Sequence, residues 1–441
     1  MNANDHELHG DASPDRARRL DWFGGRKFGI FVHWGLEAGY GKCKHVSSPQ
    51  AQQIARDFDR NATGFDPQAW LDVFQWAGAR YVVLTAKHGH DFFLYPSEVN
   101  PFHSDRDYVG ELAQACGKRG MPLFLYFNLN SFGLPERAET GVKEKNVSEQ
   151  QRRIALTLQE YCERYEPTGI WLDAWPSCVH AFETAGLDPR EVFDFEAITA
   201  PVREHDENIL IGNKEMFPPH TDFLTSESMF TTHFGEPLAR PGVVTETADT
   251  LPGSGWFSTR AKQDDFFTAR KIEAQSVYYL KRLISAVGRG SNYLLDAGPL
   301  PDGSLQRVEK EILLRMGEWL ERNGRAVYDT LPLRDGRQDW GYAVGKDERI
   351  YLHIMDNRDL VKAHDCSEWD PCLKTSDWKT GDIPASGRLD IPESWAGDLT
   401  QVRGLHGGTL PVEWEGGICK VDAADLDPDP VSKIFVLDKR N

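Results

Sequence analysis

Several features that mark other classes of protein are missing from this sequence. No apolar run approaches the ~18 residues needed to cross a bilayer. The first 20 residues, MNANDHELHGDASPDRARRL, are polar and lack the apolar segment of a secretory signal. We therefore expect a cytoplasmic protein, with a secreted or periplasmic location as the alternative if a leader has been removed from this sequence.

The chain also has fewer positively than negatively charged residues, and few of its cysteines lie close together. The chain has 50 Lys and Arg against 68 Asp and Glu, a net charge of -18. A field of this sign repels phosphate backbones and anionic lipids, so we expect neither nucleic acid nor membrane as a partner. The seven cysteines are scattered, and only Cys366 and Cys372 lie close together. Their spacing fits neither a disulfide framework nor a cysteine zinc site.

The chain does contain a regular alternation of short apolar runs and longer amphipathic stretches, which is typical of an α/β barrel. At 441 residues it exceeds what one hydrophobic core normally serves. We read strands over 28–33, 81–86, 123–127, 169–173, 209–213, 243–246 and 292–296, and helices over 66–77, 108–118, 148–165, 266–287 and 306–323. Seven strands of a (β/α)8-like TIM barrel are thus accounted for.

The texture of the sequence changes after about Asp335. Short alternating strands separated by Gly, Pro and Asp are predicted over 349–354, 387–391, 400–404, 412–415 and 434–437. This spacing indicates an antiparallel β-sandwich. The expected organisation is a polar tail over 1–20, a catalytic barrel over 21–334 and a C-terminal β-sandwich over 335–441.

Polar residues at the C-terminal ends of barrel strands face the active site, because the βα loops gather there. The predicted strand ends supply His33, Trp34, Lys87, His88, His90, Asp173, Trp175, Asn213, Glu215 and Glu246. Two carboxyl groups among imidazoles and indoles are the equipment of glycoside hydrolysis, in which one attacks the anomeric carbon and the other protonates the leaving oxygen. We therefore expect a carbohydrate substrate.

A metal site is the alternative interpretation of the same residues. His33, His88, His90 and Asp173 are chemically able to hold a divalent cation, and His88-Gly-His90 contains a His-x-His pair. The His-Glu-x-x-His helix motif is absent. We expect no metal and no cofactor, and a metal-dependent hydrolase on the same barrel remains the alternative.

Five segments together suggest a family. They are Trp22 to Gly35 (WFGGRKFGIFVHWG), Ala77 to His88 (AGARYVVLTAKH), Gly169 to Asp173 (GIWLD), Gly290 to Pro299 (GSNYLLDAGP) and Gly317 to Tyr328 (GEWLERNGRAVY). In this order they resemble glycoside hydrolase family 29, the α-L-fucosidases. The resemblance implies a retaining exo-glycosidase that releases α-L-fucose through a covalent glycosyl-enzyme. It assigns the nucleophile to Asp173 and sugar contacts to His33 and His88.

The segment from Lys87 to Phe92 departs from the family pattern. It reads Lys-His-Gly-His-Asp-Phe where the family usually reads Lys-His-His-Asp-Gly-Phe, so we expect His90 to replace the second sugar-contacting histidine. The departure leaves the sugar open between α-L-fucose and a stereochemically related one. It also leaves open a non-catalytic carbohydrate-binding relative on the same barrel.

The acid/base has three candidates. The segment 221–227 resembles the one in which many family members carry this residue, so Glu227 comes first, with Glu246 and Glu215 as alternatives. The retaining mechanism predicts that it lies roughly 5 to 5.5 Å from the Asp173 carboxyl. Three indoles, Trp34, Trp171 and Trp175, are candidates to pack on the sugar. The oligomeric state is not predicted.

Overall fold

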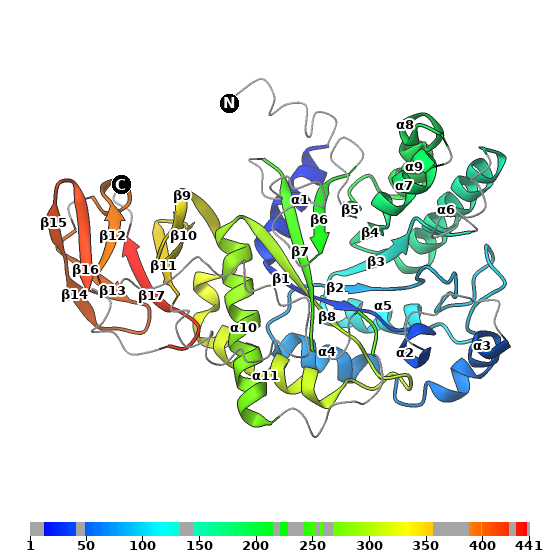
Figure 1. The fold of residues 1–441 in the computed structure, drawn as a ribbon, viewed down its shortest axis with the longest axis horizontal. Helices are drawn as coiled ribbons and strands as arrows, with labels where there is room; N and C mark the ends of the chain where they lie inside the picture. The colour runs from blue at the N-terminus through cyan, green and yellow to red at the C-terminus, as the bar shows by residue number, and fades with distance from the viewer. Residues whose placement is uncertain are drawn as a thin grey trace.

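The computed structural model describes residues 13–40, 49–132, 144–184, 186–214, 221–227, 242–252, 256–258, 268–355, 388–397, 399–422 and 429–438. An α/β barrel is followed along the chain by antiparallel β-sheets (Figure 1). Within these ranges, no helix has both the length and the apolar character required to span a membrane.

Eight parallel strands pair in sequence order, and the last pairs with the first, so the barrel is closed. They are β1 (Phe28–Val32), β2 (Val82–Leu84), β3 (Leu123–Asn128), β4 (Gly169–Asp173), β5 (Leu210–Lys214), β6 (Phe223–Glu227), β7 (Val244–Thr250) and β8 (Ser291–Ala297). The predicted barrel is confirmed. The strand that the apolar runs do not reveal is β6, because Phe223 and Leu224 are its only apolar residues.

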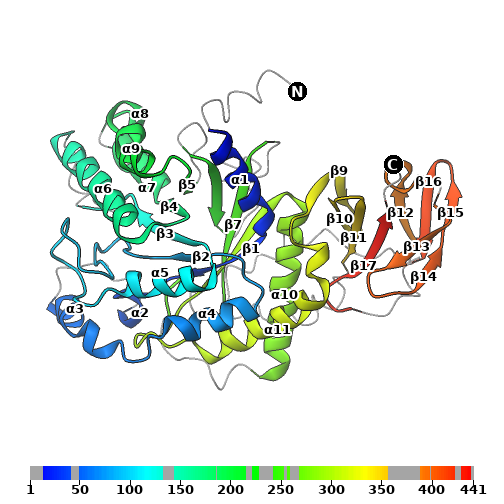
Figure 2. The same ribbon diagram turned by 180° about the vertical axis from the view of Figure 1, so that it is seen from behind.

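Helices surround the barrel on its outer side (Figures 1 and 2). They are α1 (Pro14–Arg26), α2 (Glu37–Tyr40), α3 (Pro49–Asn61), α4 (Pro67–Trp76), α5 (Tyr108–Arg119), α6 (Glu144–Tyr165), α7 (Trp175–Thr184), α8 (Pro189–Val192), α9 (Phe195–His205), α10 (Ala269–Gly288) and α11 (Arg307–Asn323). Capping carboxylates fix where two of them begin. Asp66 accepts hydrogen bonds from the backbone N–H groups of Gln68 and Ala69, and Asp107 accepts one from Gly110.

Large and small residues alternate inside the barrel, so its interior is packed. A Cβ on Gly169 would lie 2.3 Å from the Phe124 ring, and one on Gly212 would lie 2.2 Å from the Phe223 ring. Only glycine leaves room for these rings. The rings also contact Phe23 of α1, whose centroid lies 5.0 Å from Phe124 and 4.7 Å from Phe223. Phe23 is fully buried and closes the barrel at its N-terminal end.

The C-terminal unit consists of two antiparallel sheets. One has the order β14-β13-β17-β11-β10-β9 and the other β12-β16-β15. Their strands are β9 (Leu331–Gln338), β10 (Gly341–Lys346), β11 (Arg349–Ile354), β12 (Arg388–Pro392), β13 (Gln401–Gly404), β14 (Thr409–Pro411), β15 (Glu413–Glu415), β16 (Ile418–Asp422) and β17 (Lys433–Asp438), with a short helix α13 (Glu393–Ala396). Both sheets contribute to one apolar cluster, as expected for a sandwich. Because β9 starts at Leu331, the unit begins a few residues before the predicted boundary.

The sandwich packs against the barrel through α10 (Figures 1 and 2). A Cβ on Gly288 would lie 2.3 Å from the Tyr342 ring of β10, so only glycine permits this close approach. Polar contacts add to it: His406 Nε2 lies 2.8 Å from the Asn323 side-chain oxygen, and Trp319 Nε1 donates to Asp429 at 3.2 Å. These contacts brace the last barrel helix.

The position of Phe23 yields a stability prediction. Replacing Phe23 by Ala leaves a cavity among the interior rings, so we expect the free energy of unfolding to fall by about 3–5 kcal/mol. Urea denaturation followed by circular dichroism measures it. The neighbouring Trp22→Ala, whose side chain is 36% exposed, is the matched control and should cost less. An equal loss of unfolding free energy in the two variants would contradict the inference that Phe23 closes the N-terminal end of the barrel.

Candidate active site

Asp173 is the last residue of β4, and its side chain is 15% exposed at the C-terminal end of the barrel. The Tyr126 hydroxyl donates to its Oδ2 at 2.6 Å, and the backbone N–H of Ala174 donates to its Oδ1 at 2.6 Å. The second contact depends on a sharp turn after the strand, where Ala174 has a φ of +67°, rare for a residue with a side chain. The carboxylate is therefore held in one orientation.

Three donors act on the charge of Asp173. Burial by itself raises the pKa of a carboxyl group, but the positive charge of Lys214 opposes it, with further help from the Tyr126 and Ala174 hydrogen bonds. The net result is a pKa of Asp173 below its ordinary value. Asp173 is therefore ionised, as a nucleophile must be.

Lys214 lies between Asp173 and a second carboxylate. Its Nζ is 3.6 Å from Asp173 Oδ1 and 2.6 Å from Glu227 Oε1. These two oxygens are therefore at most about 6.2 Å apart, the sum of those distances. Retaining glycosidases place their carboxyl groups about 5–5.5 Å apart and inverting ones about 6.5–9.5 Å apart. A bound of about 6.2 Å on this pair of oxygens is compatible with the retaining arrangement.

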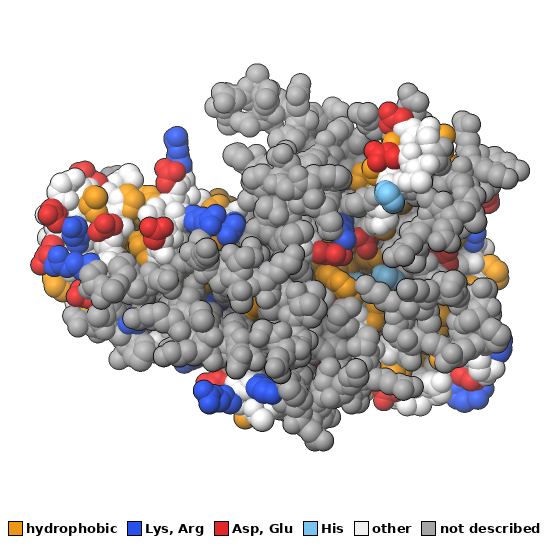
Figure 3. Space-filling model, viewed as in Figure 1, with side chains coloured by type: hydrophobic (Ala, Val, Ile, Leu, Met, Phe, Trp, Pro, Cys, Tyr) orange, Lys and Arg blue, Asp and Glu red, His pale blue; other side chains and the backbone are white. Residues whose placement is uncertain are grey.

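Glu227 ends β6, the strand that was not predicted, and its side chain is 31% exposed. In the closed barrel β5 pairs with both β4 and β6, so Asp173, Lys214 and Glu227 end three neighbouring strands. The pair expected from the sequence, Asp173 with Glu227, is thus placed at one end of the barrel. In Figure 3, acidic, basic and histidine side chains gather right of centre.

The predicted histidines lie at the same end of the barrel. His33 Nδ1 lies 2.6 Å from the buried Asp296 carboxylate, and the His33 ring is 5.8 Å from that of His88. Burial holds the pKa of His33 below its ordinary value, although the charges of Asp173 and Glu227 act to raise it. His33 is therefore neutral. With its Nδ1 proton donated to Asp296, its Nε2 is an acceptor.

Glu37 organises the altered histidine segment. One oxygen, Glu37 Oε1, lies 3.1 Å from His88 Nδ1 and 2.6 Å from His90 Nδ1. Burial acts to raise the pKa of Glu37, but the hydrogen bonds from His88 and His90 outweigh it and hold this pKa well below its usual range. The carboxylate thus orients both rings, with each Nε2 on the far side from Glu37. His90 is brought beside His88 despite the intervening Gly89.

The predicted tryptophans lie elsewhere than expected. Trp34 is 1% exposed, and its indole donates to the Leu300 carbonyl at 3.1 Å, so the prediction that it contacts a sugar is wrong. Trp34 follows the end of β1, but its ring packs on Phe58 of α3 and Trp70 of α4 in the outer helical layer. Trp175 is 9% exposed and packs on Phe193 and Phe195, with centroids 5.4 and 4.7 Å away. It belongs to the helix packing.

Three other aromatic residues lie below or beside the histidines. Trp171 lies in the barrel interior, 2% exposed, with its ring stacked 5.6 Å from that of Tyr126, so it forms the floor of the site. The Trp256 ring is 5.1 Å from His33, and the Phe257 ring is 5.2 Å from it. The apolar wall of the site therefore comes from the chain after β7.

Glu246 was expected at a strand end, and this is wrong. Strand β7 continues to Thr250, so Glu246 is its third residue and lies fully buried within the barrel. Tyr81 donates to its Oε2 at 2.5 Å and Trp171 to its Oε1 at 2.7 Å. Such a group cannot reach a leaving group at the barrel mouth. The other alternative, Glu215, lies outside the described residues.

The alternative cation site does not form as predicted. In the described part of the chain, one group of side chains could share a cation: atoms of Glu37, His88 and His90 all lie within 4.8 Å of one another. His33 and Asp173 do not belong to this group. The Nδ1 atoms of His88 and His90 donate hydrogen bonds to Glu37. The three residues therefore form a hydrogen-bonded cluster that orients the two rings.

Sequence reasoning missed Lys214, Tyr126 and Trp256. Lys214 directly follows Asn213, at which the predicted fifth strand stops, so a strand one residue longer would have included it. Tyr126 lies two residues before the end of β3, on the inward-facing alternation of the strand. Trp256 carried no signal in the sequence, because it belongs to none of the predicted strands or helices.

Comparisons with known proteins agree on one family. A sequence model of the α-L-fucosidase family matches residues 3–325. Tissue α-L-fucosidase of Rattus norvegicus is 27% identical over 370 residues, which cover 76% of each chain. That of Homo sapiens is 28% identical over 343 residues, covering 71% of this chain and 70% of the human protein.

Solved structures support the fold. Isoenzyme 1 of α-L-fucosidase from Paenibacillus thiaminolyticus superposes with a TM-score of 0.71 at 19% identity, covering 97% of this chain and 100% of that one. An α-L-fucosidase of Bacteroides thetaiotaomicron, trapped as a covalent intermediate with 2-fluoro-fucosyl fluoride, gives a TM-score of 0.72 at 19% identity. It covers 98% of this chain and 97% of its own.

Burial of Glu246 yields a prediction about stability. Burial raises the pKa of Glu246 to about 7 against hydrogen bonds from Tyr81 and Trp171 that lower it. Between its ordinary pKa of 4.5 and about 7, the folded chain therefore binds more protons than the unfolded chain, so this residue makes stability fall as pH rises.

Replacing Glu246 by Gln, which stays neutral, should make the melting temperature fall less between pH 4.5 and 7 than in the wild type. Thermal unfolding across this range measures the effect. The exposed Glu183→Gln on α7 is the control, and it should keep the wild-type slope. A wild-type slope in Glu246→Gln as well would contradict the buried, protonated glutamate.

Proposed function

This chain belongs to the α-L-fucosidase family of glycoside hydrolases, and from that premise we propose that it releases α-L-fucose from glycans or glycosides by double displacement. Asp173 is the nucleophile and Glu227 the acid/base. The observation that carries the proposal is that two carboxyl groups share Lys214, with the oxygens that face this lysine no more than about 6.2 Å apart. The covalent intermediate trapped in the Bacteroides relative is the kind of species that such a mechanism forms.

In the first step Asp173 attacks the anomeric carbon, and Glu227 protonates the departing oxygen. The hydrogen bonds from Tyr126 and Ala174, together with the charge of Lys214, keep the negative charge on Asp173. The mechanism then requires Glu227 to hold the proton that it gives to the departing oxygen.

By the start of the second step the negative charge has moved from Asp173 to Glu227, because the proton of Glu227 has left with the departing oxygen. Asp173 is an uncharged ester in the glycosyl-enzyme, and Glu227, having given up its proton, is the carboxylate that pairs with Lys214. Glu227 then takes a proton from water as the water attacks the anomeric carbon, and Asp173 leaves as a carboxylate. Lys214 therefore faces one negative charge in both halves of the reaction. The two inversions together retain the configuration.

The remaining side chains bind the sugar. His33 Nε2 accepts a hydrogen bond from a hydroxyl of the sugar ring, because the Nδ1 proton is donated to Asp296. His88 and His90, oriented by Glu37, form hydrogen bonds to further hydroxyls. Trp256 supplies an apolar face beside His33. The paired carboxylates argue for an enzyme rather than a non-catalytic carbohydrate-binding relative.

Azide rescue separates the two carboxyl roles. We expect Asp173→Ala to lower kcat on 4-nitrophenyl α-L-fucoside by roughly three orders of magnitude or more, because the covalent pathway is lost. Azide should restore turnover with inverted product, since it attacks in place of the aspartate. In Glu227→Ala azide should give the retained product, because it then attacks the intact glycosyl-enzyme.

Nuclear magnetic resonance of the glycosyl azide anomers distinguishes these outcomes. The Glu246→Gln variant is the control, and it should keep most of its activity because its side chain lies inside the barrel. Near wild-type turnover in Asp173→Ala would rule out the proposed mechanism. A retained product from Glu246→Ala with azide would transfer the acid/base role to that residue.

Removing the ammonium group of Lys214 should change the pH dependence of kcat/KM. In Lys214→Met the pKa of Asp173 loses its largest lowering influence. The acid limb of kcat/KM should therefore move up by about 1 in pH, because Asp173 is then protonated at a higher pH. Lys214→Arg keeps the positive charge and is the matched control. An unmoved acid limb in Lys214→Met would show that the lysine does not govern Asp173.

A further inference from the structure

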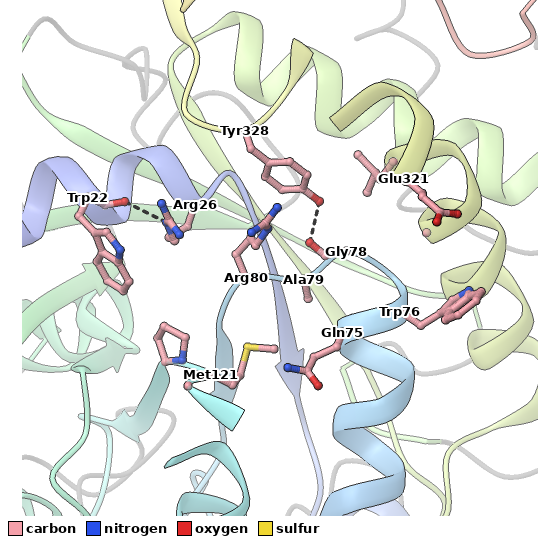
Figure 4. Close-up of a pocket in the computed structure, with 14 residues that line it drawn as sticks. Trp22, Arg26, Gln75, Trp76, Gly78, Ala79, Arg80, Met121, Glu321 and Tyr328 are labelled. Atoms are coloured by element: carbon pink, nitrogen blue, oxygen red, sulfur yellow. Dashed lines mark hydrogen bonds between the residues drawn. The ribbon is translucent and has the colours of Figure 1, made fainter. Parts of the chain in front are cut away.

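A second concave site lies at the opposite end of the barrel from Asp173. A cavity of about 600 Å³ opens between α1, α4 and α11 and the segments that lead into β2 and β3. Its lining includes Trp22, Trp76, Arg80, Met121, Glu321 and Tyr328 (Figure 4). Arg80 precedes β2, whereas the catalytic residues follow the far ends of their strands. The volume falls in the range of about 300–1,000 Å³ typical of small-molecule sites.

Two exposed indoles flank this cavity. Trp22 on α1 is 36% exposed and Trp76 on α4 is 61% exposed, and they lie on opposite sides of the cavity (Figure 4). The backbone at Trp76 packs closely on α11, because a Cβ on Gly317 would lie 2.0 Å from the Trp76 carbonyl oxygen. An exposed ring of this size is an apolar face available to a ligand.

Polar groups line the space between the indoles. The Arg80 guanidinium carbon lies 4.4 Å over the Tyr328 ring, and the Tyr328 hydroxyl donates to the Gly78 carbonyl at 2.6 Å. The Gln75 side-chain oxygen accepts from Arg119 at 3.0 Å, so its NH2 group is the part that faces the cavity (Figure 4). Glu321 on α11 adds a carboxylate. The cavity thus offers donors and an acceptor.

We propose that this cavity is a non-catalytic binding site for a neutral oligosaccharide. Sugar rings have apolar faces that pack on indoles, and their hydroxyls both donate and accept, which matches Arg80, Gln75 and Glu321 together. The charges of the lining balance, because Arg26 pairs with Asp329 at 2.9 Å and the remaining Arg80 and Glu321 have opposite signs, so the lining favours a neutral ligand. The inference rests on the proposed function, because a glycan-trimming enzyme acts where such chains are abundant.

Fucose-free tetrasaccharides test the proposal, because they are not substrates of the catalytic site. The probes are cellotetraose, xylotetraose, mannotetraose and lacto-N-tetraose, titrated calorimetrically into the full chain. We expect at least one to bind with a Kd below about 10 mM, and its affinity to fall about tenfold in Trp76→Ala and Trp22→Ala. Trp414→Ala in the sandwich, where the side chain is 39% exposed, is the matched control and should bind as the wild type.

Turnover of 4-nitrophenyl α-L-fucoside should be unchanged in all of these variants. The turnover assay tests the proposed function and the titration tests the second site, so failure of one proposal can be told from failure of the other. Arg80→Met is a second variant, expected to weaken binding while leaving both indoles in place. Binding of no neutral probe, binding unaffected by the tryptophan changes, or binding of a sulfated tetrasaccharide alone would overturn the proposal. Self-association that the tryptophan changes abolish in sedimentation would overturn it as well.

Discussion

One ammonium group between two carboxyl groups is the interaction on which this site depends. Lys214 contacts Asp173 and Glu227 from the strand that separates theirs, so its charge lowers the pKa of the nucleophile and keeps the second carboxyl within reach. Because the negative charge moves from Asp173 to Glu227 in the first half of double displacement and returns in the second, the lysine faces one carboxylate throughout. A positive charge fixed at this point is compatible with both halves of the reaction.

Supporting residues fix the side chains that meet the substrate. Tyr126 orients Asp173, Asp296 sets the tautomer of His33, and Glu37 orients His88 and His90. Each of these supports is a hydrogen bond inside the low-dielectric mouth of the barrel, where such bonds are strong and an unpaired group is costly. The departure from the family pattern around Gly89 is therefore accommodated by a carboxylate that draws both histidines together.

The two ends of the barrel have different physical characters. At the N-terminal end, Phe23 closes the barrel interior, and a cavity with exposed indoles lies outside it. At the C-terminal end lie the charged residues Asp173, Lys214 and Glu227. Between them lies a packed interior in which the small residues Gly169 and Gly212 make room for aromatic rings. The buried Glu246 belongs to this interior, which explains why a carboxylate in a plausible sequence position has no access to substrate.

The sequence by itself determined the barrel, the sandwich and the position of Asp173, because apolar periodicity reports burial and a polar residue at a strand end reports the catalytic face. It also indicated Glu227, through family resemblance, without revealing that β6 is a strand. Only the tertiary structure decided that Lys214 joins the two carboxylates, that Glu246 is buried and that Trp34 turns into the outer layer. These facts depend on how far each strand extends and which strands become neighbours when the barrel closes, and residues distant in sequence settle both.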